Sequence, residues 1–115
     1  MKLVQDIYEK LKKYPYICKV CLERKIEEND CCNYNLKLEF CDFPNYCVKN
    51  KVLFIFFDVQ NIQMKNFDGL LRAHIVVRDL RGRGLENINY YVKEDEEDMF
   101  SFYCSSIEMV ESTGM

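Results

Sequence analysis

The sequence predicts a small domain of the α+β class, in which one amino-terminal helix precedes a mainly antiparallel five-stranded sheet or a small barrel. Apolar residues recur at helical spacing near the amino terminus, and five later segments show the apolar patterns of strands. Six cysteines also gather between residues 18 and 47. The chain has 115 residues, of which 49% are hydrophobic, so residues 1–115 are expected to form a single domain around one core.

Residues 1–13 are expected to form an amphipathic helix. Lysines and acids occupy most of its surface, whereas one face is apolar at the i, i+3, i+4 spacing: Leu3, Val4, Ile7, Tyr8 and Leu11. Pro15 ends the helix, because the residue before a proline is disfavoured in helical geometry. The apolar face is expected either to pack on the core or to dock a partner.

Residues 14–50 are expected to form an irregular, cysteine-rich segment like a zinc ribbon. Cys18 and Cys21 have the C-x2-C spacing that can hold one zinc ion from a tight turn. The remaining ligands come from a set that the sequence does not narrow: Cys41 and Cys47, with Cys31 and Cys32 as alternates. Such a zinc ion would be structural, because catalytic zinc keeps an open position. The alternatives are reduced, buried thiols and a disulfide or redox pair.

The seven cysteines also indicate a cellular compartment. An odd number of cysteines fits poorly with the disulfide framework of a secreted protein, whereas cytosolic thiols stay reduced. No leader-like apolar run opens the chain, and no segment approaches the ~18 apolar residues of a membrane span. The protein is therefore expected to be intracellular, either nuclear or cytoplasmic, and to have no membrane partner.

Residues 51–105 are expected to form the β-sheet body. Val52–Phe57 is continuously apolar, as in a central strand that is covered on both faces. Four other segments alternate apolar and polar residues as half-buried strands do, one of them inside the cysteine-rich segment: residues 36–40, 71–78, 88–92 and 100–104. Turns are expected between strands at residues 42–45, 66–69 and 81–84.

Charge is distributed unevenly along the chain. The formal net charge is −3, but residues 94–115 contain seven acidic residues and no basic one. Five of the acids are consecutive, in a predicted exposed loop over residues 94–98: Glu94, Asp95, Glu96, Glu97 and Asp98. This loop is expected to be a solvated hairpin tip, a surface that docks on a basic protein partner, or a surface that covers the protein's own arginine cluster.

Residues that could carry catalysis do not form a recognisable motif. His74 is the single histidine, and no Ser or Cys nucleophile motif accompanies it. Asp58 and Asp79 fit turn capping better than a metal pair, and Arg81–Gly84 lacks the Lys-Ser/Thr of a phosphate loop. The chain is therefore not expected to be an enzyme or to take a small-molecule substrate.

Four stretches carry a resemblance to a known family: Tyr14–Cys21, Phe40–Cys47, Lys51–Gln60 and Leu70–Gly82. A cysteine segment followed by strands that could close a barrel is similar to zinc-ribbon-containing OB-fold domains, such as the carboxyl-terminal domain of the replication protein A large subunit. The resemblance implies one of two roles. In one, the domain is an assembly module that holds a partner subunit through the amphipathic helix or the loop at residues 94–98. In the other, single strands of nucleic acid stack on aromatic residues within a basic groove. The residues it points to are Arg72, Arg78, Arg81, Arg83, Tyr90 and Tyr91.

Three functional hypotheses follow from these features. The first is a non-enzymatic, zinc-stabilised module that scaffolds a nucleic-acid-handling complex through protein contacts. The second is a domain that binds single-stranded nucleic acid directly. The third is a small viral or phage-like inhibitor that covers a basic surface of its partner with residues 94–98. A protein partner is thus expected, and single-stranded nucleic acid is the alternative.

Overall fold

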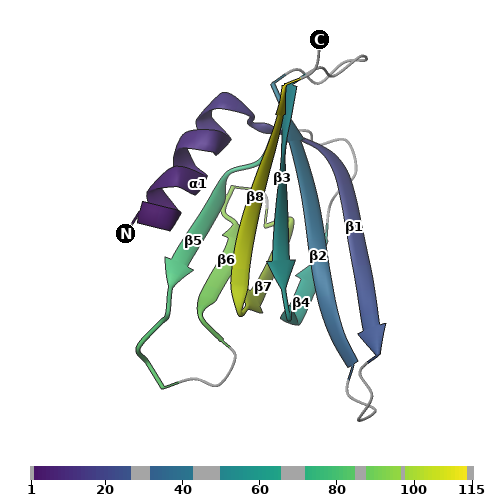
Figure 1. The fold of residues 1–115 in the computed structure, drawn as a ribbon, viewed down its shortest axis with the longest axis vertical. Coiled ribbons are helices and arrows are strands. Elements are labelled where there is room, and N and C mark those ends of the chain that lie inside the picture. Colours follow the sequence, from purple (N-terminus) through teal and green to yellow (C-terminus); the bar gives the residue numbers. More distant parts are fainter. Residues whose placement is uncertain are drawn as a thin grey trace.

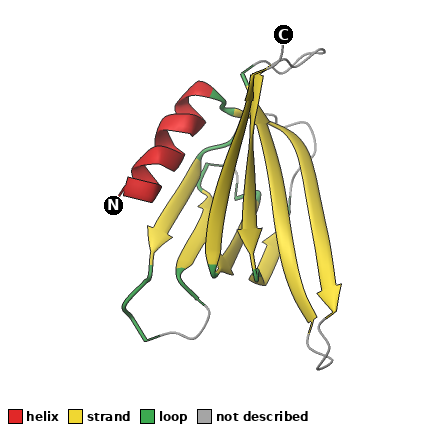
Figure 2. Cartoon of the chain, in the orientation of Figure 1, coloured by secondary structure: helices red, strands yellow, loops and turns green. Residues whose placement is uncertain are grey.

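The computed structural model describes residues 2–26, 32–42, 50–65, 72–84, 88–96 and 98–113, which form one helix and eight strands (Figures 1 and 2). The helix and strands are, in chain order, α1 (Lys2–Lys13), β1 (Tyr16–Ile26), β2 (Cys32–Cys41), β3 (Asn50–Phe57), β4 (Gln60–Met64), β5 (Ile75–Asp79), β6 (Tyr90–Glu94), β7 (Phe100–Cys104) and β8 (Ser106–Thr113). Among the described residues, no helix has the length and apolar character needed to cross a membrane.

The strands form two four-stranded antiparallel sheets that pack face to face (Figure 1). The first sheet has the order β1-β2-β3-β8, and the second has the order β4-β7-β6-β5. Phe56 of β3 and Phe102 of β7 meet across the interface with ring centroids 4.9 Å apart, in the edge-to-face geometry that aromatic pairs prefer. The core therefore lies between the inner faces of the two sheets.

The fold class predicted from the sequence is wrong. The molecule is mostly antiparallel β structure with a single short helix, and neither a zinc ribbon nor a five-stranded sheet or OB-like barrel is formed by the described residues. Residues 14–50, expected to be irregular apart from the strand at 36–40, supply the two long strands β1 and β2. The strands expected at residues 36–40, 52–57, 71–78, 88–92 and 100–104 correspond to β2, β3, β5, β6 and β7.

The amino-terminal helix is present as predicted, with α1 spanning Lys2–Lys13. Ile7 is buried on its apolar face, and Leu3, Val4 and Leu11 pack beside it against the core. The hydroxyl of Tyr8 donates to the carbonyl oxygen of Val77 (3.1 Å) and accepts from the amide of the same residue (3.0 Å). The helix thus covers the outer edge of β5 and satisfies backbone groups that no neighbouring strand pairs.

Glu111 of β8 fastens the carboxyl-terminal end of α1 to the first sheet. Its carboxylate accepts hydrogen bonds from the hydroxyl of Tyr14 (2.5 Å) and from the ammonium groups of Lys10 and Lys13. These hydrogen bonds, first from Lys10 and then from Tyr14, lower the pKa of Glu111 to about 2. The helix therefore bridges β5 of the second sheet and β8 of the first, closing one side of the two-sheet stack (Figure 1).

β3 is a central strand of the first sheet, as its apolar run predicts. Val52, Phe54 and Phe56 face the core and are buried, whereas Leu53 and Ile55 lie half-buried on the outer face, the side that faces away from the second sheet. β3 pairs with β2 on one side and with β8 on the other. Its outer face is therefore only partly covered, not enclosed as the sequence suggested.

Candidate functional site

The predicted zinc site is not formed by the described residues. Cys18 and Cys21 lie in the extended strand β1 instead of a tight turn, so their backbones stand about 10 Å apart at the rise of a strand. No group of three or more His, Cys, Asp or Glu among the described residues is arranged to hold a metal ion. Cys31 and Cys47 lie outside the described residues, as does the side chain of Cys32.

Cys18 and Cys41 are neighbours across the β1–β2 pair. Cys18 sits at a β-bulge, where the register shifts between Ile17 and Lys19, and its thiol donates to the carbonyl oxygen of Glu39 at 3.3 Å. Burial and the adjacent Cys41 thiol raise the pKa of Cys18 to about 12. Neither thiol is in a disulfide; Cys41 is buried, as the alternative of reduced, buried thiols expects, whereas Cys18 is exposed.

Cys104 shows the same structural behaviour within the core. It is fully buried in β7, and burial raises the pKa of its thiol to about 12. A thiol of this kind stays protonated and unreactive. Cys104 is therefore a core residue, as its place in the last predicted strand indicated.

The basic and aromatic residues of the predicted nucleic-acid surface do not form one platform. Tyr90 is only 4% exposed, and burial raises the pKa of its hydroxyl, so its ring is not available to stack on a base. Tyr91, the next residue, faces the opposite side of the sheet and packs on Tyr103 with ring centroids 4.8 Å apart. This part of the sequence prediction is corrected, since base stacking needs exposed rings.

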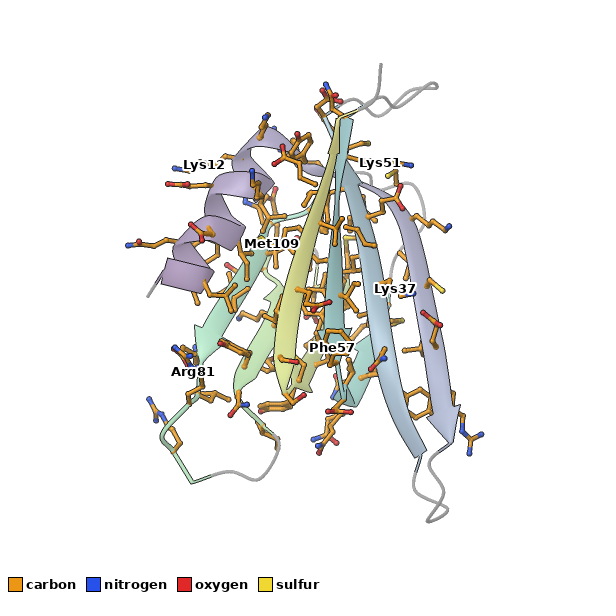
Figure 3. The ribbon with its side chains drawn as sticks, in the orientation of Figure 1. Lys12, Lys37, Lys51, Phe57, Arg81 and Met109 are labelled. Carbon is orange, nitrogen blue, oxygen red and sulfur yellow. The ribbon has the colours of Figure 1, made fainter. Side chains whose placement is uncertain are left out.

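The four arginines of that prediction are exposed and lie within residues 72–83, before, in and after β5. The backbone of Arg72 forms an isolated antiparallel β-bridge with that of Tyr16, and Arg78 lies within β5. Arg81 binds the carboxylate of Asp79 (3.1 Å) and lies over the ring of Tyr90, 5.7 Å from its centroid. Figure 3 shows Arg81 beyond the end of β5. Arg83 follows in the same turn. Arg81 is engaged within the fold by its contacts with Asp79 and Tyr90.

The acidic segment is built around one buried carboxylate. Glu94 ends β6 and is 1% exposed, so it is not part of an exposed loop as the sequence suggested. One of its oxygens accepts from the amides of His74 (3.0 Å) and Glu96 (3.1 Å), and the other accepts from the amide of Met99 (3.3 Å). Each of these hydrogen bonds satisfies a backbone donor, so Glu94 fixes the path of the chain around it.

The other described acids of the segment project into solvent. Asp95, Glu96 and Asp98 are exposed, and Glu97 lies outside the described residues. Each of the three exposed carboxylates meets one basic side chain, in the pairs Asp95–Lys93 (3.2 Å), Glu96–His74 (2.9 Å) and Asp98–Lys65 (3.0 Å). Asp95, Glu96 and Asp98 together form the acidic loop. It presents negative charge on a backbone that Glu94 holds in place.

An exposed apolar groove lies on a different part of the molecule and was missed in the sequence. Its volume is about 640 Å³, and its apolar lining comes from β1, β2 and β4 and from the residues beside them: Leu22, Tyr34, Val59, Ile62 and Met64. Leu22 is 45% exposed, and Val20, two residues before it on the same strand face, is 39% exposed. The alternation of Val20 and Leu22 with polar residues was the available signal, and the cysteine motif obscured it.

Comparison with known proteins gives one match. A family model with the description "Immunity protein PIM8" matches residues 1–110. No curated protein and no solved structure matches the chain.

Proposed function

The chain belongs to the immunity protein PIM8 family, and we propose that it protects a cell by binding a protein toxin and blocking its action. The family match over nearly the whole chain is the observation that carries this proposal. Protection by this route requires a stable complex and no catalysis. The zinc-stabilised scaffold and the nucleic-acid binder are therefore abandoned, and the small protein inhibitor is the one sequence-based hypothesis that the family match favours.

We propose that the acidic loop contacts the toxin. Asp95, Glu96 and Asp98 are exposed, while the buried Glu94 holds the surrounding backbone. A surface that is already ordered loses little conformational entropy on binding, which favours affinity. Clustered negative charge also steers a basic partner toward it and accelerates association.

The ion pairs Asp95–Lys93 and Asp98–Lys65 and the Glu96–His74 contact do not prevent this role. Their partners, Lys93, His74 and Lys65, lie at the surface, where such pairs contribute little because water and salt screen them. Lys or Arg side chains on the toxin can therefore replace Lys93, His74 and Lys65 as partners of the acidic loop at a small cost in free energy. The expected partner is a protein whose binding face is basic.

The function is tested by finding the toxin and measuring protection. The tagged chain is used to capture its partner from cells of its source, and mass spectrometry identifies the captured protein. Expression of that protein alone is expected to arrest growth, and co-expression of this chain is expected to restore it. A captured protein that is harmless, or that arrests growth equally with and without this chain, contradicts the proposal.

The surface is tested with a charge-neutral variant of the acidic loop, Asp95→Asn, Glu96→Gln and Asp98→Asn together. We expect its affinity for the toxin to fall by about tenfold or more, mostly through slower association at low salt. The matched control, Glu9→Gln, Asp42→Asn and Glu108→Gln, removes three exposed acids elsewhere and is expected to bind normally. Equal affinity of the two variants would exclude the acidic loop while leaving toxin binding itself intact.

A further inference from the structure

The described residues leave the edge of β1 uncovered, in contrast to the opposite side of the molecule. Among the described residues, β1 pairs with β2 along its length and otherwise makes only the single bridge between Tyr16 and Arg72. The edges of β5 and β8, by contrast, are covered by α1 through Tyr8 and Glu111. β1 forms the right-hand border of the first sheet in Figure 1, away from the helix. Such an edge presents a row of backbone donors and acceptors to another strand.

The inner face of β1 carries apolar side chains that the core does not cover. Val20 lies opposite Leu38 and Leu22 opposite Leu36, so both point to the inner face of the first sheet. Leu38 and Leu36 are buried, whereas Val20 and Leu22 remain 39% and 45% exposed, and Leu22 lines the groove beside β4. Four large apolar side chains in the described residues are exposed to this degree, and two of them are on this one strand.

Charges on the outer face form two rows that cross the strands toward this edge. In one row Lys37 of β2 binds Glu23 of β1 at 2.6 Å, so the row ends on an acid. In the other, Lys51 of β3 binds Glu39 of β2 at 2.8 Å, and Glu39 lies opposite Lys19 of β1, so the row ends on a base. Figure 3 shows Lys37 and Lys51 on their strands. Glu23 and Lys19 flank Cys21 symmetrically, two residues to each side.

We propose that β1 pairs antiparallel with β1 of a second copy of this chain, about a two-fold axis through Cys21. This register places Lys19 opposite Glu23 of the second copy on the outer face. It places Val20 opposite Leu22 of the second copy on the inner face, and Cys21 opposite its own equivalent. Both charge rows then continue across the junction with alternating sign, and the exposed apolar pairs cover one another. The two first sheets become one continuous sheet of eight strands.

A second copy fits this edge better than an unrelated strand because the pattern is self-complementary. A two-fold interface requires that residue i meets j while j meets i, and the sequence Lys19-Val20-Cys21-Leu22-Glu23 meets this condition for charge and for apolar size. Opposite charges and apolar side chains placed directly across antiparallel strands stabilise the pair, whereas like charges destabilise it. Self-association does not depend on the identity of the toxin or on toxin binding.

The test uses charge reversal on each side of the axis. The purified wild-type chain is expected to show a concentration-dependent dimer by sedimentation velocity. Lys19→Glu alone places two acids opposite each other, and Glu23→Lys alone places two bases opposite each other. Each is expected to raise the dimer dissociation constant by about tenfold or more, since the repulsion occurs twice per dimer. A mixture of the two variants is expected to form a heterodimer, because both contacts then join opposite charges.

Matched controls separate the interface from general charge effects. Lys12→Glu and Glu9→Lys reverse exposed charges on α1 and are expected to dimerise as the wild type does. Far-UV circular dichroism checks that every variant is folded. A wild-type chain that stays monomeric at every concentration overturns the proposal, as does a dimer that neither reversal weakens. A monomer whose β1 variants lose only toxin binding assigns the edge to the toxin and also overturns it.

A covalent probe reports the register directly. Opposed residues of antiparallel strands have Cα atoms about 4.5–5.5 Å apart, within the range that a disulfide can join. Diamide, which accepts the two thiol hydrogens, is expected to link Cys21 of one copy to Cys21 of the other. Trypsin then releases residues 20–24, whose single cysteine is Cys21, as a disulfide-linked pair for mass spectrometry. Failure to link Cys21 in a dimer would exclude this register.

Discussion

Glu94 illustrates how much one residue in a run of like residues can differ from its neighbours. Five consecutive acids suggest a solvated loop, and composition alone cannot single out the one that turns inward. Glu94 does so because it continues the alternation of Tyr90 and Val92 on the buried face of β6. Its carboxylate then meets the amides of His74, Glu96 and Met99. The strand pattern therefore held the information, and the charge obscured it.

Loss of the Glu94 carboxylate is expected to destabilise the protein. Glu94→Ala leaves backbone donors unsatisfied, one of them fully buried, at a cost of about 2–4 kcal/mol in the free energy of unfolding. The control Asp95→Ala changes an exposed, screened carboxylate and is expected to cost about 0.5 kcal/mol or less. Urea unfolding followed by tyrosine fluorescence measures both. Equal losses would contradict the role assigned to Glu94.

Glu111 is expected to make stability depend on pH in acid. Hydrogen bonds from Lys10 and Tyr14 lower its folded-state pKa from 4.5 to about 2. Because the folded pKa lies below the unfolded one, the stabilisation is present above pH 4.5 and is lost as the pH falls toward 2. Glu111→Gln is expected to unfold at a lower temperature than the wild type at neutral pH, and the difference should close by about pH 2. Thermal melts of both proteins, with Glu108→Gln as a control on the same strand, test this; a constant difference across the range would contradict it.

At the scale of the elements, the sequence predicted those strands that have a strong apolar pattern and bury one face. β2, β6 and β7 show alternation and β3 a continuous apolar run, with side chains such as Leu38, Phe54 and Phe102 in the core. β4 was missed because it is short and mostly exposed, with three polar residues, Gln60, Asn61 and Gln63, among its five. β1 was missed because the spacing of its cysteines suggested a metal ligand pair. Edge strands carry a weak periodic signal, since they bury less of either face.

The helix predicted from the sequence docks through a contact that the sequence could not reveal. Tyr8 lies on the apolar face, but its hydroxyl pairs with both backbone groups of Val77 on the edge of β5. Tyr8→Phe is expected to reduce the free energy of unfolding by about 1–3 kcal/mol, because both groups lose their partner. Tyr91→Phe is the control, since its ring packs on Tyr103. Denaturant unfolding that finds the two variants equally stable would contradict this role of Tyr8.

At the scale of the whole molecule, the sheets join segments that are far apart in the chain. Phe54 of β3 pairs with Met109 of β8, and Gln60 of β4 pairs with Tyr103 of β7. Ser105 lies between β7 of the second sheet and β8 of the first, and its hydroxyl donates to the carbonyl oxygen of Phe57 at the end of β3 (3.2 Å). This connectivity could not be read from local patterns, because each strand pattern is compatible with many partners.

Refolding is therefore expected to be slow for a chain of this size. Long-range pairing of antiparallel strands must lose chain entropy before contacts compensate for it, which typically places folding at about milliseconds to seconds. Stopped-flow tyrosine fluorescence measures the rate, since the chain has eight tyrosines and no tryptophan. Refolding complete within about 100 microseconds would contradict the expectation.

The function could be predicted from the sequence only as one of several hypotheses. The acidic segment suggested an inhibitor that covers a basic surface, but the cysteines favoured zinc and nucleic acid. Recognition depends on which side chains reach the surface of a particular fold. Tyr90 and Glu94 were both expected there, and both are buried. Fold and exposure had to be known before the candidate surfaces could be separated from the core.

The hydrogen bonds that Glu94 makes beneath the acidic loop determine which substitutions the loop tolerates during evolution. Glu94 holds the backbone through amide groups, so the identities of side chains 95 and 96 are not needed for that scaffold. Asp98, with a φ of 54°, tolerates chiefly Asn or Gly, whereas Asp95 and Glu96 can be substituted by other residues. The proposed toxin contact can thus adapt to an altered toxin by single substitutions at residues 95 and 96, while the fold beneath stays unchanged.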